Sequence, residues 1–421
     1  FLRPEPIPPD NLRDLTITHA MPAHSHVLIV GAGPVGLTLA YALRRSGVKV
    51  TVIETDTAVS RQLRASTFHP PTLDMLQDWG ITDELIARGR ITPTWQIRLH
   101  ETGEHVTFDL SVLKDDTAHP YRLQCEQAVL SDALEARLKR ESGARIWRGA
   151  SVIDVGQHAS GAWVEVRSPE GTAERIEADY VVGCDGAHSL VRKAIGSDFE
   201  GGTYPDTTLL VTTHFAFDAL WPDLAGVNYI WQDEGTYSLL HLPQVWRVSL
   251  HPMADRPLEE EAQPERIIGR LHKLFGREHR FELLEIRPYR VHKRLASKWR
   301  AGRLFIAGDA AHLNNPKGGM GMNGGIHDAI CLSQTLVRAL DGAPEAVLGA
   351  YERQRLPVVR EDIIGQADRN HARMQLRSLE ERRASLAQLQ ALIDDRDRLR
   401  RHLRQTSMLD GLERARQLAE A

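Results

Sequence analysis

The chain has 421 residues, of which 42% are hydrophobic and 26% are charged. This composition is typical of a soluble globular protein, and it excludes a disordered chain, a collagen and a disulfide scaffold. With 52 Lys and Arg against 56 Asp and Glu, the formal net charge is -4, so nothing indicates a nucleic-acid partner. The length predicts roughly two or three structural units.

Cysteine usage and the first residues bear on the cellular compartment. Cys125, Cys184 and Cys331 are far apart and show no metal-binding spacing, so we expect no metal site and a reducing, cytoplasmic location. Residues 1–25 are rich in proline and contain no continuous apolar run, which predicts a loose extension and not a secretory signal. The longest apolar stretch, residues 27–43, is interrupted by glycines and a proline, so we expect no membrane span.

Residues 26–54 predict a strand, a glycine turn, a helix and a second strand. An apolar run at 27–30 precedes the sequence GAGPVG at 31–36, and a β-branched run at 48–53 ends in Glu54. The first glycine makes the turn, the second lets the backbone approach a pyrophosphate, and the third permits close packing of helix on strand. The helix N-terminus attracts the phosphates, and the terminal acid can bind ribose hydroxyls. This segment therefore predicts a dinucleotide site.

Two later segments also place an aspartate at the end of an apolar strand. Residues 180–182 run into Asp185 and a short helix that carries Arg192, and residues 304–307 run into Asp309 and a glycine-rich loop. Doubly wound sheets bind ligands at the carboxyl ends of such strands. A nicotinamide dehydrogenase needs neither segment, so the pair favours FAD over NAD as the bound dinucleotide.

The three segments resemble the GxGxxG, DG and GD fingerprints of the single-component (group A) FAD-dependent aromatic hydroxylases, which are the para-hydroxybenzoate hydroxylase-like monooxygenases. The fingerprints occur in the family's order over about residues 25–345. The resemblance implies that Glu54 holds the adenine ribose and that Asp309 binds the ribityl chain. It implies cofactor contacts from Gly31, Gly33, Pro34, Val35, Gly36, Glu54, Arg64, Gln127, Asp185, Arg192, Gly308, Asp309, Pro316, Gly321, Met322 and Asn323.

The resemblance also implies particular roles around the flavin ring. Asp185 and Arg192 would shape the region where FAD meets the reduced nicotinamide, and Pro316 would lie beside the flavin. The backbone at 321–323 would face the pyrimidine edge of the ring, where helix amides stabilise the negative charge of reduced flavin. His312, which follows the GD motif, is interpreted as a residue that orders the loop.

Two matches leave alternatives open. The family has an arginine that contacts the cofactor and helps to seat NAD(P)H, and Arg64 is preferred over Arg61 for this role, with a plain surface arginine as the alternative. Gln127 begins an amphipathic helix where the family places a glutamine that contacts flavin. Its alternative is an ordinary polar residue at a helix start.

The fold class that follows is α/β, with a Rossmann-like FAD-binding domain, an inserted sheet and C-terminal helices. The discontinuous FAD-binding domain is expected from residues 26–90, 119–202 and 301–345. A mostly antiparallel substrate-binding sheet is expected from residues 91–118 and 203–300, with alternating runs at 207–217, 227–232, 237–242 and 245–251 and a helical stretch at 260–275. Residues 346–421 predict charged, solvated helices packed on the FAD domain, with a contribution to a dimer contact as the alternative.

The resemblance implies that NADH or NADPH reduces the flavin, that dioxygen adds at flavin C4a, and that this hydroperoxide hydroxylates a phenolic or hydroxypyridine-like ring. One dinucleotide fingerprint is present, so the nicotinamide is expected to lack a separate Rossmann domain. The expected partners are a small aromatic substrate and dioxygen, with the protein a monomer or homodimer. The candidate catalytic groups on the covering strands are His214, Tyr237, His241 and Arg247, and an arginine facing the pocket would favour a carboxylated substrate.

Other functions share parts of these motifs. A flavin-dependent halogenase or an isoprenoid-type reductase would have the same fold, although the WxWxIP motif of halogenases is absent from the sequence. A flavin-binding protein without turnover is the alternative from a different class. Substrate-dependent oxygen consumption would separate the hydroxylase from all of these.

Overall fold

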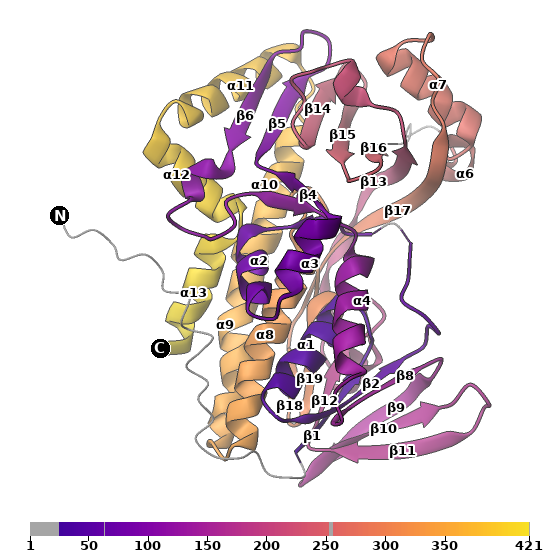
Figure 1. Cartoon of the computed structure of the whole chain (residues 1–421), viewed down its shortest axis with the longest axis vertical. Helices are drawn as coiled ribbons and strands as arrows, with labels where there is room; N and C mark the ends of the chain where they lie inside the picture. Colours follow the sequence, from indigo (N-terminus) through magenta and orange to yellow (C-terminus); the bar gives the residue numbers. More distant parts are fainter. Residues whose placement is uncertain (1–24, 63, 252–255, 421) are drawn as a thin grey trace, which may run out of the picture.

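The computed structural model describes residues 25–62, 64–251 and 256–420. The extension expected over residues 1–25 lies outside the described residues apart from Ser25. The described chain forms two layered halves joined by long strands (Figure 1). The lower half is built on a parallel sheet, and the upper half on a larger antiparallel one.

The lower sheet has six strands in the order β18-β19-β12-β1-β2-β8 among the described residues. They are Arg300–Ala301 (β18), Leu304–Ile306 (β19), Tyr180–Gly183 (β12), His26–Val30 (β1), Lys49–Glu54 (β2) and Ala144–Arg148 (β8). All neighbours are parallel except β18 and β19. The strand order reverses at β1, so the carboxyl ends of β1, β2, β12 and β19 meet at one edge, where such sheets bind ligands.

Helices cover this sheet because their buried faces are apolar. They are Pro34–Arg45 (α1), Pro70–Gln77 (α2), Ile81–Arg88 (α3), Gln127–Leu138 (α4), Leu190–Ala194 (α5) and Gly321–Leu340 (α8). The helix α8 is buried over most of its length, as expected for a helix with apolar residues on nearly every side. It packs against α1, so the helices that follow the two glycine-containing turns lie side by side.

Two small sheets belong to the lower half. Ser151–His158 (β9), Gly161–Arg167 (β10) and Ala173–Ala178 (β11) form an antiparallel meander at the base of the molecule (Figure 1). Thr67–Phe68 (β3), Arg122–Gln124 (β7) and Arg90–Thr92 (β4) form the second sheet.

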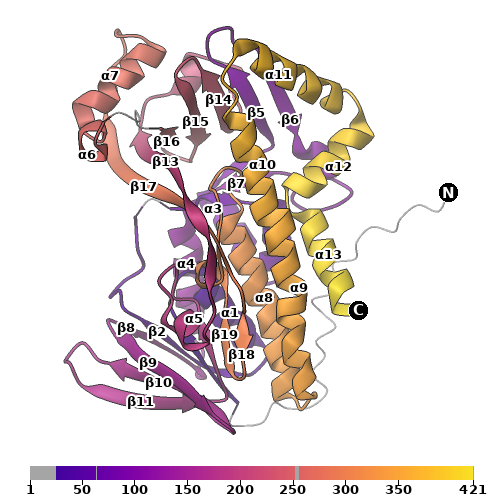
Figure 2. The same ribbon diagram turned by 180° about the vertical axis from the view of Figure 1, so that it is seen from behind.

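The upper sheet has eight strands in the order β20-β17-β13-β16-β15-β14-β5-β6 within the described ranges. They are His312–Leu313 (β20), Leu283–Ala296 (β17), Phe199–Thr213 (β13), Trp246–Leu250 (β16), Gly235–His241 (β15), Val227–Gln232 (β14), Thr94–Leu99 (β5) and His105–Asp109 (β6). Only β14 and β5 pair in parallel among these strands. Residues 94–109 contribute β5 and β6 to this inserted sheet, and residues 199–296 contribute β13 to β17. The long strands β13 and β17 connect the two halves (Figure 2).

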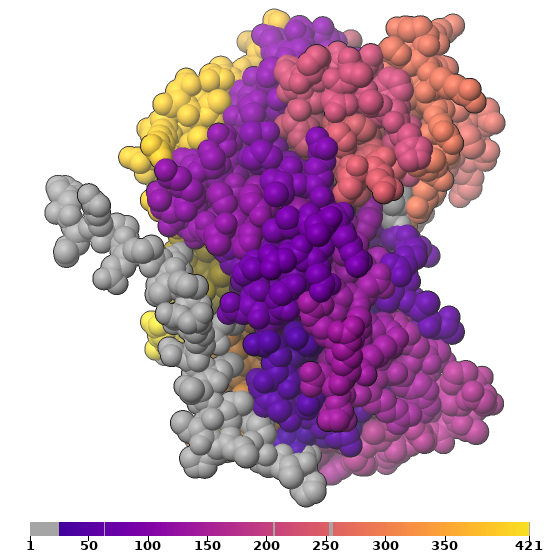
Figure 3. Space-filling view, in the orientation of Figure 1, coloured from indigo at the N-terminus to yellow at the C-terminus, as the bar shows by residue number. Residues whose placement is uncertain are grey.

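Helices cover both faces of the upper sheet. Leu258–Glu261 (α6) and Pro264–Phe275 (α7) lie on one face, and Leu379–Ile393 (α11) and Arg396–Thr406 (α12) lie on the other, over β5 and β6. The C-terminal region, which was expected on the FAD domain, therefore also packs on the upper sheet. Leu386, Leu389 and Leu403 are buried against the sheet, and the C-terminal helices meet the β5–β6 segment without a gap (Figure 3).

A nearly continuous helical rod runs along the back of the molecule between the two halves (Figure 2). It consists of Ala350–Val358 (α9), a π-helical segment at Val359–Ile364 (η6) and Gly365–Met374 (α10). Pro357 lies inside α9, and its missing amide explains why the regular hydrogen-bond pattern changes directly afterwards. The last helix, Leu409–Glu420 (α13), packs on α9. Within the described residues, no helix combines the length and apolar character needed to cross a bilayer.

Candidate FAD and substrate site

The glycine turn between β1 and α1 has three glycines in three different environments. Gly31 has a φ of +105°, and a Cβ placed on it would lie 2.3 Å from the carbonyl oxygen of Cys184. A Cβ on Gly36 would lie 2.0 Å from the carbonyl oxygen of Gly31. By contrast, nothing lies within 4 Å of the position that a Cβ on Gly33 would take. The turn and the helix packing thus require Gly31 and Gly36, whereas Gly33 leaves open space at the start of α1.

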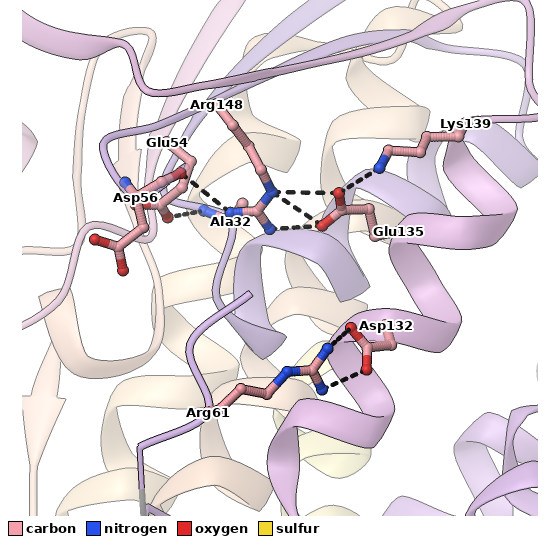
Figure 4. A network of polar contacts seen from close by, with 8 residues as sticks. All are labelled: Ala32, Glu54, Asp56, Arg61, Asp132, Glu135, Lys139 and Arg148. Atoms are coloured by element: carbon pink, nitrogen blue, oxygen red, sulfur yellow. Dashed lines mark hydrogen bonds and ion pairs between the residues drawn. The ribbon is translucent and has the colours of Figure 1, made fainter. Parts of the chain in front are cut away.

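Glu54 ends β2 and lies beside this turn (Figure 4). Its carboxylate accepts hydrogen bonds from the backbone amides of Ala32 at 2.7 Å and Asp56 at 2.9 Å. Nearby, the Arg148 guanidinium at the end of β8 donates to Glu135 on α4, with an Nε to Oε2 distance of 3.1 Å. Glu54, which is predicted to bind the ribose, is therefore held in place by backbone amides, whereas the neighbouring Arg148 is paired with Glu135.

Asp185 and Arg192 brace the loop after β12. One oxygen of Asp185 accepts from the amide of Leu190 at 2.7 Å, while Oδ1 is buried and has no hydrogen-bond partner among the described residues. Burial raises the pKa of this carboxyl. Arg192 donates to the carbonyls of Ala310 at 3.0 Å and Ala187 at 2.8 Å. It therefore ties the loop after β12 to the loop after β19.

Asp309 lies in the short turn Gly308–Ala310 (η4) that follows β19. Its carboxylate is exposed to a cavity but lies deep in the molecule, so burial raises its pKa, while His312 and Arg64 oppose that shift. The preceding Gly308 has a φ of +62°, and a Cβ there would lie 2.9 Å from Val35 on α1. Glycine at this position therefore allows the loop to approach the helix that follows the glycine turn.

A buried ion network supports this loop. Asp328 on α8 accepts a hydrogen bond from Arg355 Nε at 2.7 Å and pairs with His312 Nε2 at 2.7 Å. The three side chains are at most 1% exposed. Burial raises the pKa of Asp328, but Arg355 and His312 together lower it to about 2. The loop-ordering role predicted for His312 agrees with this geometry. Sequence reasoning missed Arg355, because one arginine in a charged helical region gives no local signal of burial.

The glycine-rich loop leads into α8. Some residues of the loop and of the first turn of α8 line the cavity, and others hold the loop in place. Pro316, Gly321 and Met322 line the cavity. Asn323 is fully buried, and its side-chain amide donates to the backbone carbonyls of Thr67 at 2.8 Å and Gly319 at 2.7 Å. The Asn323 side chain thus fixes the loop, and the first turn of α8 lies at the cavity wall.

The cavity has a volume of about 580 Å³ and lies between the two halves. The glycine turn, the η4 loop and the start of α8 form one wall, and one face of the upper sheet forms the other. The predicted cofactor residues that line it are Gly33, Pro34, Val35, Arg64, Gln127, Asp309, Pro316, Gly321 and Met322. The remaining predicted cofactor residues lie outside this lining, within the turns and helices that support it: Gly31, Gly36, Glu54, Asp185, Arg192, Gly308 and Asn323.

Strand register decides which candidate catalytic side chains reach the cavity. Arg247 on β16 lines it, whereas its neighbours Trp246 and Val248 pack in the core under α7. Tyr237 borders the cavity, but its ring lies in the same core and its hydroxyl hydrogen-bonds to His100 Nδ1 at 2.7 Å. Burial raises the pKa of Tyr237 well above its ordinary value, so the phenol stays protonated and packed away from the substrate side.

Arg247 joins the upper sheet to the loop after β2 and to the start of α4. Its guanidinium donates to the carbonyl oxygen of Arg64 at 2.9 Å, to Ser66 Oγ at 2.8 Å and to Glu126 Oε1 at 2.6 Å. Burial lowers the pKa of Arg247, and Glu126 opposes that shift. Because Gln127 directly follows Glu126, this arginine positions both predicted cavity residues, Arg64 and Gln127.

His214 and His241 lie outside the described cavity lining. His214 is an exposed residue beyond the end of β13, and its Nδ1 lies 3.1 Å from the carbonyl oxygen of Gln244. His241 stacks on Trp246 with ring centroids 4.1 Å apart. It shares the core side of β15 with Tyr237, because alternate residues of a strand point to the same face. The structure therefore gives no support to these two histidines as pocket groups.

The two candidate arginines after β2 occupy different environments. Arg61 is 67% exposed and forms an ion pair with Asp132 on α4 at 2.6 Å (Figure 4). Arg64 lines the cavity together with Gln127. The geometry therefore favours Arg64 over Arg61 as the arginine that contacts the cofactor.

Sequence comparison places this chain in a known family. A profile of the family described as the FAD binding domain matches residues 24–363. The chain is 33% identical over 340 residues to 6-hydroxy-3-succinoylpyridine 3-monooxygenase HspB of Pseudomonas putida, covering 80% of this chain and 85% of that protein. The chain belongs to the FAD-dependent aromatic hydroxylase family. This hydroxylase is also 33% identical over 339 residues to para-nitrophenol 4-monooxygenase of a Pseudomonas species, covering 79% and 83% of the two chains.

Solved structures of hydroxylases have the same fold. The crystal structure of p-nitrophenol 4-monooxygenase PnpA from Pseudomonas putida superposes with a TM-score of 0.85 at 28% identity, covering 92% of this hydroxylase and 98% of that chain. The ternary complex of aklavinone-11 hydroxylase with FAD and aklavinone gives a TM-score of 0.73 at 28% identity, covering 84% and 70%.

The residues present in the hydroxylase fit FAD. The turn at Gly33 leaves space for a ligand, and the first turn of α1 has no side-chain cap, so its amides suit a pyrophosphate. Asp309 offers a carboxylate to the cavity, where sugar-alcohol hydroxyls can donate to it. Backbone groups at the start of α8 provide donors for a flavin ring.

Several cavity-lining residues of the upper sheet escaped prediction. They are Tyr229, Thr236, Ser238, Ser249, His251, Arg287 and Tyr289. One signal was present in and directly after β16, where Arg247, Ser249 and His251 alternate with Trp246, Val248 and Leu250. This alternation separates a polar face from an apolar one, but it does not reveal which face meets the flavin half.

Proposed function

We propose that this protein hydroxylates a small phenolic or hydroxypyridine-like compound, using FAD, NADH or NADPH, and dioxygen. The observation that carries the proposal is the cavity of about 580 Å³, which joins the glycine-turn side to the polar face of the upper sheet. Its size is in the range of small-molecule sites. The names of two relatives, one acting on a hydroxypyridine and one on a nitrophenol, support the same class of substrate.

Bound FAD would supply the hydride-accepting and oxygen-transferring chemistry. The protein would hold its pyrophosphate at Gly33 and the amides of α1, its adenine ribose at Glu54 and its ribityl chain at Asp309. Arg64 would contact the cofactor and help to seat the nicotinamide. These assignments rest on the open space at Gly33, the strand-end position of Glu54 and the exposure of Asp309 to the cavity.

On the substrate side, the sheet would orient the ring and exclude water. Leu210, Leu240 and Val291 give the cavity apolar wall area, which favours a flat aromatic ring and disfavours bulk water. Tyr289 can donate a hydrogen bond on this wall, because burial raises its pKa and its phenol keeps its proton. A cytoplasmic location and a monomeric or homodimeric state stay predictions from the sequence.

Anaerobic stopped-flow measurement of flavin absorbance tests the proposed function. The holoenzyme is mixed with NADH or NADPH, alone and with phenols, hydroxybenzoates or hydroxypyridines. We expect one class of compound to accelerate bleaching, because a substrate that binds preferentially to the conformation in which the flavin can be reduced raises the population of that conformation. The same compound should give a hydroxylated product when dioxygen is admitted. Bound flavin that no combination bleaches would contradict the proposal and favour reduction by another partner.

A further inference from the structure

Positive charge is concentrated in the cavity. Among the described residues that line it, Asp309 is the only acidic side chain, whereas Arg64, Arg247, Arg287 and Lys317 also line it. Asp309 lies on the wall assigned to the cofactor. Besides its apolar residues, the space left for a substrate is bordered by cations and hydroxyl groups, which favours a ligand that carries negative charge.

The four cations occupy different environments. Arg247 is engaged by Glu126, Ser66 and a backbone carbonyl. Arg64 is close enough to influence both Arg287 and Asp309 electrostatically, so these arginines belong to the Asp309 end of the cavity. Lys317 lies on the loop between Pro316 and the start of α8, beside the position assigned to the flavin ring.

The backbone on both sides of Lys317 is fixed. Its amide donates to Asn315 Oδ1 at 3.0 Å, and its carbonyl accepts from Asn370 Nδ2 at 3.2 Å. The next amide, that of Gly318, donates to Tyr229 Oη at 3.0 Å. A side chain on such a constrained loop can offer its charge at a defined place, which lowers the entropic cost of binding.

His251 orients the ammonium group from the opposite wall. Its Nδ1 lies 3.3 Å from the carbonyl oxygen of Thr207, and its Nε2 lies 3.4 Å from Lys317 Nζ. A carbonyl can only accept, so Nδ1 carries the hydrogen in this pair, and Nε2 of the neutral ring is left as an acceptor for the ammonium. The histidine is therefore a positioning residue for the lysine.

We propose that Lys317, oriented by His251, binds a negatively charged oxygen of the aromatic substrate and makes the enzyme select anionic over neutral aromatic compounds. The proposal rests on the proposed function, because it assigns a group in that same cavity. The oxygen is either the ionised ring hydroxyl or a carboxylate substituent. Both present the same chemistry to an ammonium group.

Ligand titration of the FAD-loaded enzyme, without NADH or NADPH, tests the proposal. Binding is followed by the change in flavin absorbance for two matched pairs: 4-nitrophenol with 4-nitroanisole, and 4-hydroxybenzoate with 4-hydroxybenzamide. The variant Lys317→Met removes the charge and keeps much of the side-chain length. We expect it to raise the Kd of an anionic member by about tenfold or more and that of its neutral partner by less than about twofold. An effect confined to the nitrophenol pair identifies the ring oxygen as the group that is bound, and an effect confined to the benzoate pair identifies the carboxylate.

Two further variants separate charge recognition from a structural role. Lys317→Arg keeps the charge and should retain much of the preference for the anion. His251→Leu should weaken anion binding, whereas His251→Gln, which keeps an acceptor, should weaken it less. All variants should keep the wild-type FAD content, because the lysine side chain is not assigned to the cofactor.

The outcomes distinguish the two levels of the proposal. If the wild-type enzyme binds and hydroxylates an aromatic anion but Lys317→Met leaves the preference for the anion unchanged, the assignment of Lys317 is overturned and the proposed function stands. An equal loss for anionic and neutral ligands also overturns the assignment. If no phenol or hydroxypyridine binds the wild-type enzyme or speeds flavin bleaching, the proposed function and the assignment both fail.

Discussion

The wall proposed for the cofactor, formed by the glycine turn, the η4 loop and the start of α8, and the wall proposed for the substrate, formed by the upper sheet, use the chain in different ways. We call them the cofactor wall and the substrate wall. On the cofactor wall, the decisive features belong to the backbone: a glycine with a φ of +105°, a helix start and strand ends. On the substrate wall, side chains on alternate residues of β13 to β17 determine what the cavity offers. Backbone requirements restrict the sequence to a few residue types, whereas a strand face accepts many, and this difference decides what can be recognised from sequence.

The cofactor wall also has a buried charged support. Asp328, His312 and Arg355 are a buried charged network behind the η4 loop. The substrate wall packs on the apolar core under α7, and Arg247 connects this wall to Glu126 through an ion pair.

Loss of Asp328 should have the largest effect on stability. Asp328→Ala leaves the buried Arg355 cation without its carboxylate, which typically costs about 3–5 kcal/mol of unfolding free energy. The matched control is Glu345→Ala, which breaks the pair of Arg300 with an 81% exposed carboxylate and should cost less than about 1 kcal/mol. Denaturant midpoints followed by tryptophan fluorescence measure both. Equal midpoints for the two variants would show that the network does not support the cofactor wall.

Acid should destabilise the cofactor half through two buried histidines. Burial is the main reason why the pKa values of His69 and His327 fall from 6.5 to about 3. Between these values the unfolded chain binds protons that the folded chain does not, so stability falls as the pH is lowered, by about 2 kcal/mol per histidine between about pH 7 and about pH 5. Asp328 does not contribute in this window, because its depressed pKa of about 2 gives stability that is lost only at lower pH.

Measurement of the denaturation midpoint against pH tests this expectation. His327→Gln can still hydrogen-bond to Thr72, the partner of His327 Nε2 at 3.0 Å, but cannot titrate. It should reduce the pH dependence by the contribution of one histidine, about 2 kcal/mol between about pH 7 and about pH 5, because one proton uptake site is removed. An unchanged slope would mean that the acid sensitivity arises elsewhere.

Two small substitutions separate folding from cofactor binding at the glycine turn. Gly33→Ala adds a methyl group to a residue with a φ of −73° and to space that the protein leaves open, so the apoprotein should remain as stable as the wild type. The methyl group should obstruct the pyrophosphate and weaken FAD binding by at least about tenfold, or about 1.4 kcal/mol. Gly31→Ala should instead destabilise the apoprotein, because its Cβ would clash with the Cys184 carbonyl.

Flavin fluorescence titration and thermal melting of the apoprotein give both readouts. Asp309→Ala should also lose FAD, while Glu174→Ala, on the exposed strand β11, should keep it. Full FAD occupancy in Asp309→Ala would remove that residue from the cofactor site, and normal affinity in Gly33→Ala would remove the glycine turn from it.

The same difference between backbone requirements and strand faces explains which parts of the molecule could be predicted from the sequence. The sheet with β1, β2, β12 and β19, the inserted sheet and the family could be predicted because glycine turns and strand-end acids are local patterns. The strand β17 was not predicted, because its sequence LLEIRPYRVHKRLA contains a proline and many charges. Its pairing with β13 depends on partners far away in the chain.

The candidate catalytic groups show the same limit at single-residue scale. His241 and Tyr237 point into the core, whereas Ser238, one residue away, lines the cavity. A shift of one residue exchanges the two faces of a strand, so composition and spacing cannot choose between them. The covering of β5 and β6 by α11 and α12 also depends on tertiary packing that charge patterns do not encode.

The smallest expected effect concerns Arg61 and distinguishes it from Arg64. The pair of Arg61 with Asp132 is 67% and 33% exposed, so Arg61→Ala should change the unfolding free energy by less than about 1 kcal/mol. Its guanidinium is engaged away from the cavity, so the KM for NADH or NADPH should stay within about twofold of the wild type, which corresponds to less than about 0.5 kcal/mol. Arg64→Ala has the same loss of charge in the same loop, but it removes a side chain that lines the cavity and should raise that KM more. If Arg61→Ala raised the KM and Arg64→Ala did not, the nicotinamide would approach from the α4 side, and the cofactor wall would extend beyond the cavity to the surface around Asp132.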